Sequence, residues 1–425
     1  MQIISDLHLH SRFSRAVSRE MTIPNLSVWG EKKGIGLLAT GDWTHPLWMK
    51  DIETNLEEMG NGLLRLKGKK DSPLFLLSTE LSCIFSQNGK TRRIHTLVWV
   101  PSIAGAVRIS QEITKRGGNV MSDGRPILGF SLIQLSEMIL SIEPNALIVP
   151  AHCWTPWFSV YGQMGGFESL KEAFGEYEKY IYAVETGLSS SPDMNWRIAE
   201  LDTRSIVSFS DAHSGPKLGR EATIFDLPTL TYGNIKKALM NYKNDTAKPR
   251  ITSTIEFYPE EGKYHFTGHR DCQVRLTPEE VEQRGTTCSV CGKPLTQGVM
   301  QRVEQLATRP RMEKTAHRPS FTMLVPLVEI IGEAIGRPVT SPKVAIHYDA
   351  LLRACKSEFN ILINESLETI KIISTPEIAD GISRVRTGDI VIDPGYDGVF
   401  GVVKIWKSEK DKALVFSAGE QIGIF

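Results

Sequence analysis

Short aliphatic runs alternate with amphipathic segments along the first 230 residues of the chain. Runs rich in Ile, Leu and Val predict strands at 2–5, 36–40, 74–79, 94–100, 146–150, 182–184 and 205–208. Apolar residues at helical spacing lie between them, for example at 131–141 and 170–180. Strands that alternate with helices predict a mostly parallel sheet covered by helices, and the strand number approaches that of a closed barrel.

The pattern changes after residue 230. Residues 231–250 are locally basic, and the runs 251–258 and 263–266 around a Pro-Glu-Glu-Gly turn predict a β-hairpin. A Cys- and His-containing segment follows, then helical patterns at 322–336 and 346–354 and a β-like tail from 370. We therefore expect three domains: an α/β domain at 1–230, a connector, hairpin and small module at 231–310, and a helical plus β region at 311–425.

Composition narrows the possible partners. Hydrophobic residues make up 41% of the chain, and 49 basic residues balance 49 acidic ones, which excludes a strongly basic nucleic-acid binder. Any contact with nucleic acid must come from local basic patches. The chain has no 20-residue apolar span, no signal-peptide pattern at its start, and six cysteines of which two form one Cys-x-x-Cys. We therefore expect a cytoplasmic protein without a membrane partner.

Metal-ligating side chains gather at the predicted strand ends. Six of the ten histidines lie at or near strand boundaries in the first half of the chain. The residues concerned are Asp6, His8, His10, Asp42, His45, Glu80, His95, His152, Glu185, Asp211 and His213. Because the carboxyl ends of parallel strands meet at one rim, these imidazoles and carboxylates can converge and bind two or three divalent ions. Such ions activate water and stabilise charge on a phosphoryl oxygen.

Basic residues follow the first and last ligand pairs. Arg12 and Arg15 come after His10, and Lys217 and Arg220 come after His213. On the same rim they would contact phosphate, although each is as readily explained as a solvated surface charge. The first half of the chain therefore predicts a phosphoesterase centre.

The run Asp6-Leu7-His8-Leu9-His10, with Glu80, His95, His152 and Asp211-Ala212-His213, resembles the PHP superfamily (polymerase and histidinol phosphatase). The resemblance implies a distorted (β/α)7 barrel whose ions, Zn, Mg or Mn, are held by His8, His10, Asp42, Glu80, His95, His152, Asp211 and His213. Ser14-Arg15 stands where many members carry another ligand. On the second strand we favour Asp42 as the ligand, with His45 as the alternative.

A second cluster has the spacing of a structural zinc site. His269 and Cys272 are separated by two residues, as are Cys288 and Cys291 after a 15-residue interval. Four such ligands in two turns are typical of tetrahedral Zn²⁺, and the module would fold only around its metal. A closed zinc site performs no chemistry, so we expect this zinc-ribbon-like module to position a nucleic acid through its basic flanks.

A further set of segments lies at 264–272, 288–296, 183–189, 194–196 and Asp393-Pro394-Gly395-Tyr396-Asp397-Gly398-Val399. Together with the layout of the chain, these segments resemble endonuclease Q, a DNA-repair family, over nearly the whole sequence. The resemblance implies hydrolysis of the phosphodiester on the 5′ side of uracil, hypoxanthine, xanthine or an abasic site in double-stranded DNA. A replication or repair clamp is a further candidate partner on which the sequence itself is silent. Asp211 and His213 would be catalytic. Asp193 would take the place of the Asp expected before Pro192.

Three other functions compete with this one. A phosphomonoesterase of the histidinol-phosphate type would use the same barrel without the zinc module, and a 3′ exonuclease would degrade DNA from its ends. A non-catalytic nucleic-acid-binding module would hold no metal at the barrel. A labelled duplex with one deoxyuridine or deoxyinosine separates them, because only the lesion-specific endonuclease makes a single internal nick.

Overall fold

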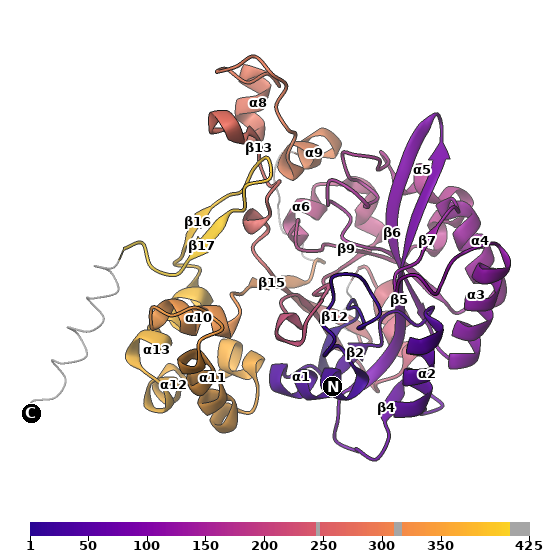
Figure 1. Cartoon of the computed structure of the whole chain (residues 1–425), viewed down its shortest axis with the longest axis horizontal. Coiled ribbons are helices and arrows are strands. Elements are labelled where there is room, and N and C mark those ends of the chain that lie inside the picture. Colours follow the sequence, from indigo (N-terminus) through magenta and orange to yellow (C-terminus); the bar gives the residue numbers. More distant parts are fainter. Residues whose placement is uncertain (244–246, 310–316, 409–425) are drawn as a thin grey trace, which may run out of the picture.

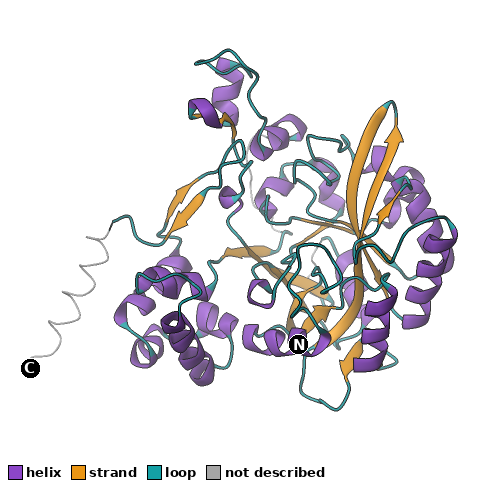
Figure 2. Ribbon diagram, in the orientation of Figure 1, coloured by secondary structure: helices purple, strands orange, loops and turns teal. Residues whose placement is uncertain are grey.

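A computed structural model of the chain describes residues 1–243, 247–309 and 317–408. Most strands gather on one side of the molecule and are surrounded by helices, as Figure 2 shows. The C-terminal helices and the segment around the Cys/His cluster lie apart from this sheet (Figure 1). No helix in the described part of the chain is long and apolar enough to cross a membrane.

The central sheet is mixed. β1 (Gln2–Asp6), β2 (Leu37–Ala39) and β5 (Leu74–Gln87) run parallel to one another. The strands that pair antiparallel with them or with each other are β3 (Leu56–Glu58), β4 (Leu64–Leu66), β6 (Lys90–Val100), β8 (Leu147–Pro150), β11 (Ala222–Asp226) and β12 (Arg250–Glu256). β7 (Ile127–Leu128) lies parallel to β5, and β15 (Ser320–Met323) lies parallel to β12.

Two further strands, β9 (Ala183–Glu185) and β10 (Ser205–Val207), form a separate parallel pair. Among the described residues, the strand ladders therefore do not close into the predicted barrel. The fold class that the structure shows is the coarser one, a mixed α/β fold.

Helices pack around the sheet through their apolar faces. They are α1 (Ile23–Lys33), α2 (Pro46–Asn55), α3 (Ile103–Lys115), α4 (Leu132–Ile142), α5 (Leu170–Phe174), α6 (Pro192–Trp196) and α7 (Tyr232–Met240). The α4 helix illustrates the local signals: Ser131 accepts from the Gln134 backbone N–H while the Gln134 side chain accepts from the Ser131 N–H. This capping box satisfies two N–H groups at the helix start, and Leu132, Leu135 and Ile139 enter the core.

The segment around the Cys/His cluster is small. It contains β13 (Thr267–His269), β14 (Val274–Leu276), α8 (Pro278–Arg284) and α9 (Val299–Leu306). Beyond it, α10 (Leu327–Ala334), α11 (Pro342–Cys355), α12 (Leu367–Ile373) and α13 (Pro376–Thr387) pack together, and β16 (Val391–Asp393) pairs antiparallel with β17 (Val402–Lys404). A buried ion pair of 2.7 Å between Lys33 Nζ and Glu358 joins α1 to the segment after α11.

Two predicted elements are wrong. The run 251–258 does not pair with 263–266: β12 pairs with β11 and with β15, because Ile251 and Ile255 enter the core of the main sheet. The tail from 370 is not simply β-like, since α13 occupies 376–387 between the Thr375 cap and Gly388. The predicted boundary between 310 and 311 lies outside the described residues.

A candidate metal centre at the strand ends

Three side chains form a first group beyond the end of β1. Their nearest atoms are His8 Nε2, His10 Nε2 and Asp211 Oδ1. Asp211 Oδ1 lies 3.6 Å from His8 Nε2 and 3.2 Å from His10 Nε2. All three atoms are buried and form no hydrogen bond in the structure. Ligand atoms about 2.0–2.2 Å from a tetrahedral ion lie about 3.3–3.6 Å from one another. The group therefore has the donor chemistry and spacing that a divalent ion requires.

A second group adjoins the first. Glu80 Oε1 lies 2.8 Å from His95 Nδ1 and 2.9 Å from His152 Nε2, and the two rings approach to 3.3 Å. Glu80 comes from β5, His95 from β6, and His152 follows β8. The other oxygen, Glu80 Oε2, lies 3.3 Å from His10 Nε2. Glu80 thus stands between the groups, and six side chains that can bind metals converge in one place.

Two further carboxylates face the outer nitrogens of the first histidines. Asp42 Oδ1 lies 3.0 Å from His10 Nδ1, and Glu185 Oε1 lies 2.9 Å from His8 Nδ1. Asp42 Oδ2 accepts from Ser11 N and Ser14 Oγ, so its oxygens already have partners. A carboxylate on the outer nitrogen fixes the tautomer that leaves Nε2 free to bind a metal. The placement favours an orienting role for Asp42 over the ligand role predicted from the sequence.

The backbone is strained at three of these positions. Asp42, His152 and Asp211 have positive φ angles of 43°, 29° and 47°. A non-glycine residue in this region costs of order 1–3 kcal/mol, and such residues concentrate at functional sites. The surrounding contacts supply the compensation: the His152 N–H donates to Glu185 Oε2 at 2.7 Å. The fold therefore holds these side chains in place at a cost in backbone energy.

The opposite charges within the cluster shift the pKa values of its histidines and carboxylates. Burial lowers the pKa of His8, but Glu185, Asp211 and Glu80 outweigh it and hold that pKa well above its usual range. Burial raises the pKa of Glu80, but His95, Arg125 and His8 outweigh it and lower that pKa well below its usual range. Carboxylates that stabilise imidazolium ions also attract divalent cations, and binding such a cation would displace the protons.

Arg125 is a residue that the sequence analysis missed. Its Nη1 lies 2.9 Å from Glu80 Oε2, and its side chain is 26% exposed. It belongs to the loop between α3 and β7, where no strand end or periodic pattern marks it. Glu185 stood in the strand-end pattern but was not among the predicted ligands.

Besides Asp42, three predicted residues lie outside both groups. His213 Nδ1 donates to the Asp211 carbonyl at 2.8 Å, and its ring centroid is 4.8 Å from that of His10, so it borders the first group. The ring of His45 instead stacks on Phe13 at 4.5 Å. Asp193 accepts a hydrogen bond from Ser191 at the start of α6.

The predicted phosphate-binding cations have different surroundings. Arg12 pairs with Asp51 at 2.7 Å, Arg15 with Asp123 at 3.4 Å, and Lys217 with Glu329 at 3.4 Å. Arg220 differs, because it donates to the Ser210 carbonyl at 2.9 Å and reaches the Asp211 carbonyl at 3.5 Å. Arg220 is therefore the predicted cation in contact with the backbone of the cluster.

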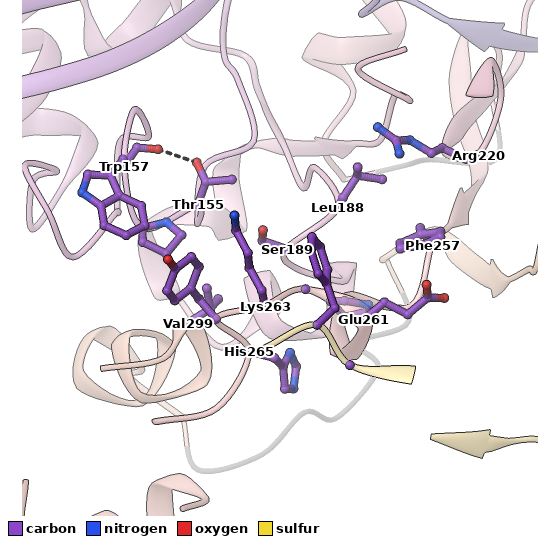
Figure 3. A pocket seen from close by; sticks show the side chains of 16 residues that line it. Thr155, Trp157, Leu188, Ser189, Arg220, Phe257, Glu261, Lys263, His265 and Val299 are labelled. Atoms are coloured by element: carbon purple, nitrogen blue, oxygen red, sulfur yellow. Dashed lines mark hydrogen bonds between the residues drawn. The ribbon is translucent and has the colours of Figure 1, made fainter. Parts of the chain in front are cut away.

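The structure contains a cavity of about 610 Å³, whose lining residues Figure 3 shows. Thr155, which contacts His152 Nδ1 at 3.0 Å, and Arg220 lie in its wall. The remaining wall comes from Trp157, Leu188, Ser189, segment 257–265, Val299, Phe400 and Gly401. The volume is within the range of small-ligand sites, roughly 300–1,000 Å³. The cavity thus connects the strand ends, the segment before β13, and the turn between β16 and β17.

The second predicted metal site is also assembled. The ligand atoms of His269, Cys272, Cys288 and Cys291 all lie within 4.8 Å of one another. The Cys291 Sγ to His269 Nδ1 distance is 3.5 Å. The Cys288 N–H donates to the Lys293 carbonyl and the Gly292 N–H to the Cys288 carbonyl, which closes the turn around the second cysteine pair. This arrangement indicates a structural zinc module.

Comparison with known proteins gives consistent matches. Residues 326–389 match the MJ0043 C-terminal domain family. The chain is 28% identical to YqxK of Bacillus subtilis over 95% of its length and 99% of YqxK. It is 30% identical over 254 residues to MJ0043 of Methanocaldococcus jannaschii, covering 59% of this chain but only 31% of that protein.

Solved structures match over nearly the whole chain. The lesion-specific endonuclease PfuEndoQ of Pyrococcus furiosus has a TM-score of 0.83 and 30% identity, covering 96% of this chain and 97% of that one. A structure of endonuclease Q with a 27-mer duplex that carries an abasic lesion at the active site has a TM-score of 0.82, with the same identity and coverage.

Proposed function

Because this chain belongs to the endonuclease Q family, we propose that it is a metal-dependent DNA-repair endonuclease that cuts DNA at damaged nucleotides. The observation that carries the proposal is the group of three buried atoms on His8, His10 and Asp211 that lie at the spacing of metal ligands and form no hydrogen bond. Such atoms are costly in a folded protein unless a ligand satisfies them. A divalent ion is the ligand that two imidazole nitrogens and one carboxylate oxygen share.

The residues divide into holding and orienting roles. His8, His10 and Asp211 hold one ion, and Glu80, His95 and His152 hold another. Asp42 and Glu185 orient the two histidines of the first group, and His213 borders the site where a scissile phosphate would lie. Divalent ions bound there lower the pKa of water and stabilise charge on phosphoryl oxygens. We further propose three domains: a distorted (β/α)7 barrel at 1–230, the connector and zinc module at 231–310, and a helical plus β region at 311–425.

Cations around the cluster supply the contacts to DNA. Arg125 and Arg220 border the metal-binding groups and would contact the phosphates beside the cut. Arg12, Arg15 and Lys217 pair with carboxylates nearer the surface and would exchange those partners for phosphates farther along the strand. The structural zinc module would position the duplex, and a replication or repair clamp is a further partner.

The cavity beside Arg220 is the proposed site of the damaged nucleotide. It lies next to the cluster and is large enough for a base extruded from the duplex. Uracil, hypoxanthine and xanthine share a C=O beside an N–H, so one set of donors and acceptors serves all three. Cytosine or adenine would leave a buried polar group unpaired, at a cost of about 1–3 kcal/mol. We propose cleavage on the 5′ side of these bases and of abasic sites.

The test uses labelled duplexes that differ at one position: deoxyuridine, deoxyinosine, an abasic site, or an undamaged base. A single nick 5′ of each lesion and none in the undamaged duplex is the expected result. An end-dependent ladder would indicate a 3′ exonuclease, and activity confined to small phosphomonoesters would indicate a phosphatase. Either result would replace the proposed function. A duplex that is bound but not cut when divalent metal is added would favour the binding-module alternative.

A further inference from the structure

The turn between β16 and β17 presents an exposed aromatic ring at the edge of the cavity. Phe400 is 70% exposed, the largest exposed fraction among the aromatic side chains that the structure describes. It lines the cavity of Figure 3 together with Gly401. A single exposed apolar side chain is ordinary in a folded protein, but a ring at the rim of a ligand-sized cavity is placed where it can contact the bound molecule. The metal-binding groups make no use of this ring.

The chain fixes the turn firmly although the ring itself is unburied. Backbone hydrogen bonds join the turn to 260–266: Gly395 N to Glu260 O (2.8 Å), Gly401 N to Glu261 O (3.1 Å), Gly398 N to Lys263 O (2.8 Å) and Phe266 N to Gly395 O (2.9 Å). Tyr396 and Val399 also exchange reciprocal backbone hydrogen bonds. At Gly401 a Cβ atom would come within 2.0 Å of the Glu260 carbonyl, so only glycine permits this approach. The position of Phe400 is therefore set by the backbone rather than by packing of its own side chain.

The surroundings of the ring suit a polyanion that carries flat bases. Lys263 Nζ lies 5.6 Å from the Phe400 ring centroid and 5.7 Å from that of Tyr264. Within the described residues Lys263 forms no ion pair with a carboxylate. Tyr264 in turn meets Trp157 edge to face at 5.1 Å. Aromatic side chains next to unpaired cations are the combination with which proteins bind unstacked nucleic acid.

We infer that Phe400 is a wedge: its ring enters the duplex and occupies the space that the extruded nucleotide leaves. The inference rests on the proposed function, since a wedge acts only where a nucleotide leaves the stack. Apolar side chains inserted between base steps offset the cost of unstacking. A turn already held by backbone hydrogen bonds can insert its side chain without first being ordered. The Asp393–Val399 motif thereby gains a role, because it builds the turn that carries Phe400.

The test compares Phe400→Ala with the wild type on one abasic-lesion sequence, as a duplex and as a single strand. Affinity is measured by fluorescence anisotropy without added divalent ions, a condition that leaves the zinc of the small module in place, and single-turnover cleavage is measured after metal is added. Stacking on an aromatic ring changes affinity by about 5- to 150-fold. We expect a loss in this range on the duplex and a change within about twofold on the single strand, which has no stack to replace. Phe400→Leu, which keeps an apolar wedge, should retain most of the duplex affinity.

The matched control is Ile372→Ala, which removes an 84% exposed apolar side chain on α12 that lies outside the cavity wall. It should bind both DNAs as the wild type does. An equal loss of Phe400→Ala on single strand and duplex would overturn the wedge and make the ring a wall of the nucleotide site. An unchanged duplex affinity would also overturn it. Failure of the wild type to prefer lesion DNA over undamaged DNA is a separate result, which would overturn the proposed function itself.

Discussion

Replacing Asp42 by Asn tests whether this residue orients His10 or binds the metal itself. Asp42 Oδ2 accepts from Ser11 N at 2.6 Å and from Ser14 Oγ at 2.9 Å, whereas Oδ1 faces His10 Nδ1 at 3.0 Å. An Asn at 42 will keep its carbonyl on the two donors, because an NH₂ group there would meet the Ser11 N–H. The amide NH₂ then faces His10 Nδ1. Asn also tolerates the left-handed backbone at this position.

The substitution changes the proton on the ring. With an NH₂ donor opposite Nδ1, that nitrogen becomes an acceptor and the proton moves to Nε2, the atom that faces Asp211 and Glu80. A protonated Nε2 cannot bind a metal. Loss of such an orienting partner lowers metal affinity or activity by about 10–100-fold, which corresponds to about 1.4–2.7 kcal/mol. We expect a reduction of this size for Asp42→Asn.

The assay is a competition titration of the purified protein with a metal-binding indicator, with cleavage measured in parallel. Ser14→Ala is the matched control, because it removes one hydrogen bond to Asp42 without changing charge or tautomer. It should lower affinity only a few-fold. The decisive variant combines Asp42→Asn with His10→Gln. If Asp42 acts only through His10, the double variant will match His10→Gln alone. A further 10-fold loss in the double variant would refute the orienting role and restore Asp42 as a ligand.

Two further predictions concern the zinc module and a buried acid. Cys288→Ala should release one zinc ion and weaken DNA binding while the circular dichroism of the α/β part persists, whereas Cys355→Ala should keep its zinc; unchanged DNA affinity after zinc loss would exclude the positioning role. Burial raises the pKa of Glu256 to about 8 despite its hydrogen bond from Ser208. Between about pH 4.5 and pH 8 this carboxyl is ionised in the unfolded chain but protonated in the folded protein, so the free energy of unfolding falls as pH rises through that range. Glu256→Gln should therefore raise the melting temperature by an amount that grows from pH 5 to pH 9, worth a few kcal/mol at the upper end; parallel curves for variant and wild type would contradict this.

The strand-end pattern located the cluster because ligand positions follow locally from strand geometry. His8 and His10 are two residues apart on an extended segment, so they project to the same side. Asp211 meets them because the His10 N–H donates to the carbonyl of the next residue, Ala212, at 3.0 Å. The zinc module could also be predicted from the sequence, since its four ligands lie close together along the chain. The metal-binding roles of these residues stay predictions until ions are measured.

Other features depend on contacts between distant segments. Which oxygen of Asp42 faces His10 is decided within a few ångströms, and no sequence spacing encodes it. Arg125 reaches Glu80 from a loop without a periodic pattern. The pairing of β12 with β15 joins segments separated by the zinc module, so the local hairpin signal at 251–266 was misleading. For α13 the local signals are present in the sequence, with Thr375 before Pro376 and Gly388 after the last turn.

Single-turnover cleavage of an abasic-lesion duplex by the wild type and by Asp211→Ala tests the central claim most directly. The variant removes the carboxylate that completes the first group beside its two histidines. The account predicts a single nick by the wild type and a loss of several orders of magnitude in the variant, since bound ions supply several kcal/mol of transition-state stabilisation. Affinity for the lesion duplex, measured beside it at fixed salt, should stay the same or rise, because one negative charge near the phosphates is gone. Cleavage by the variant near the wild-type rate would contradict the assignment of the metal centre.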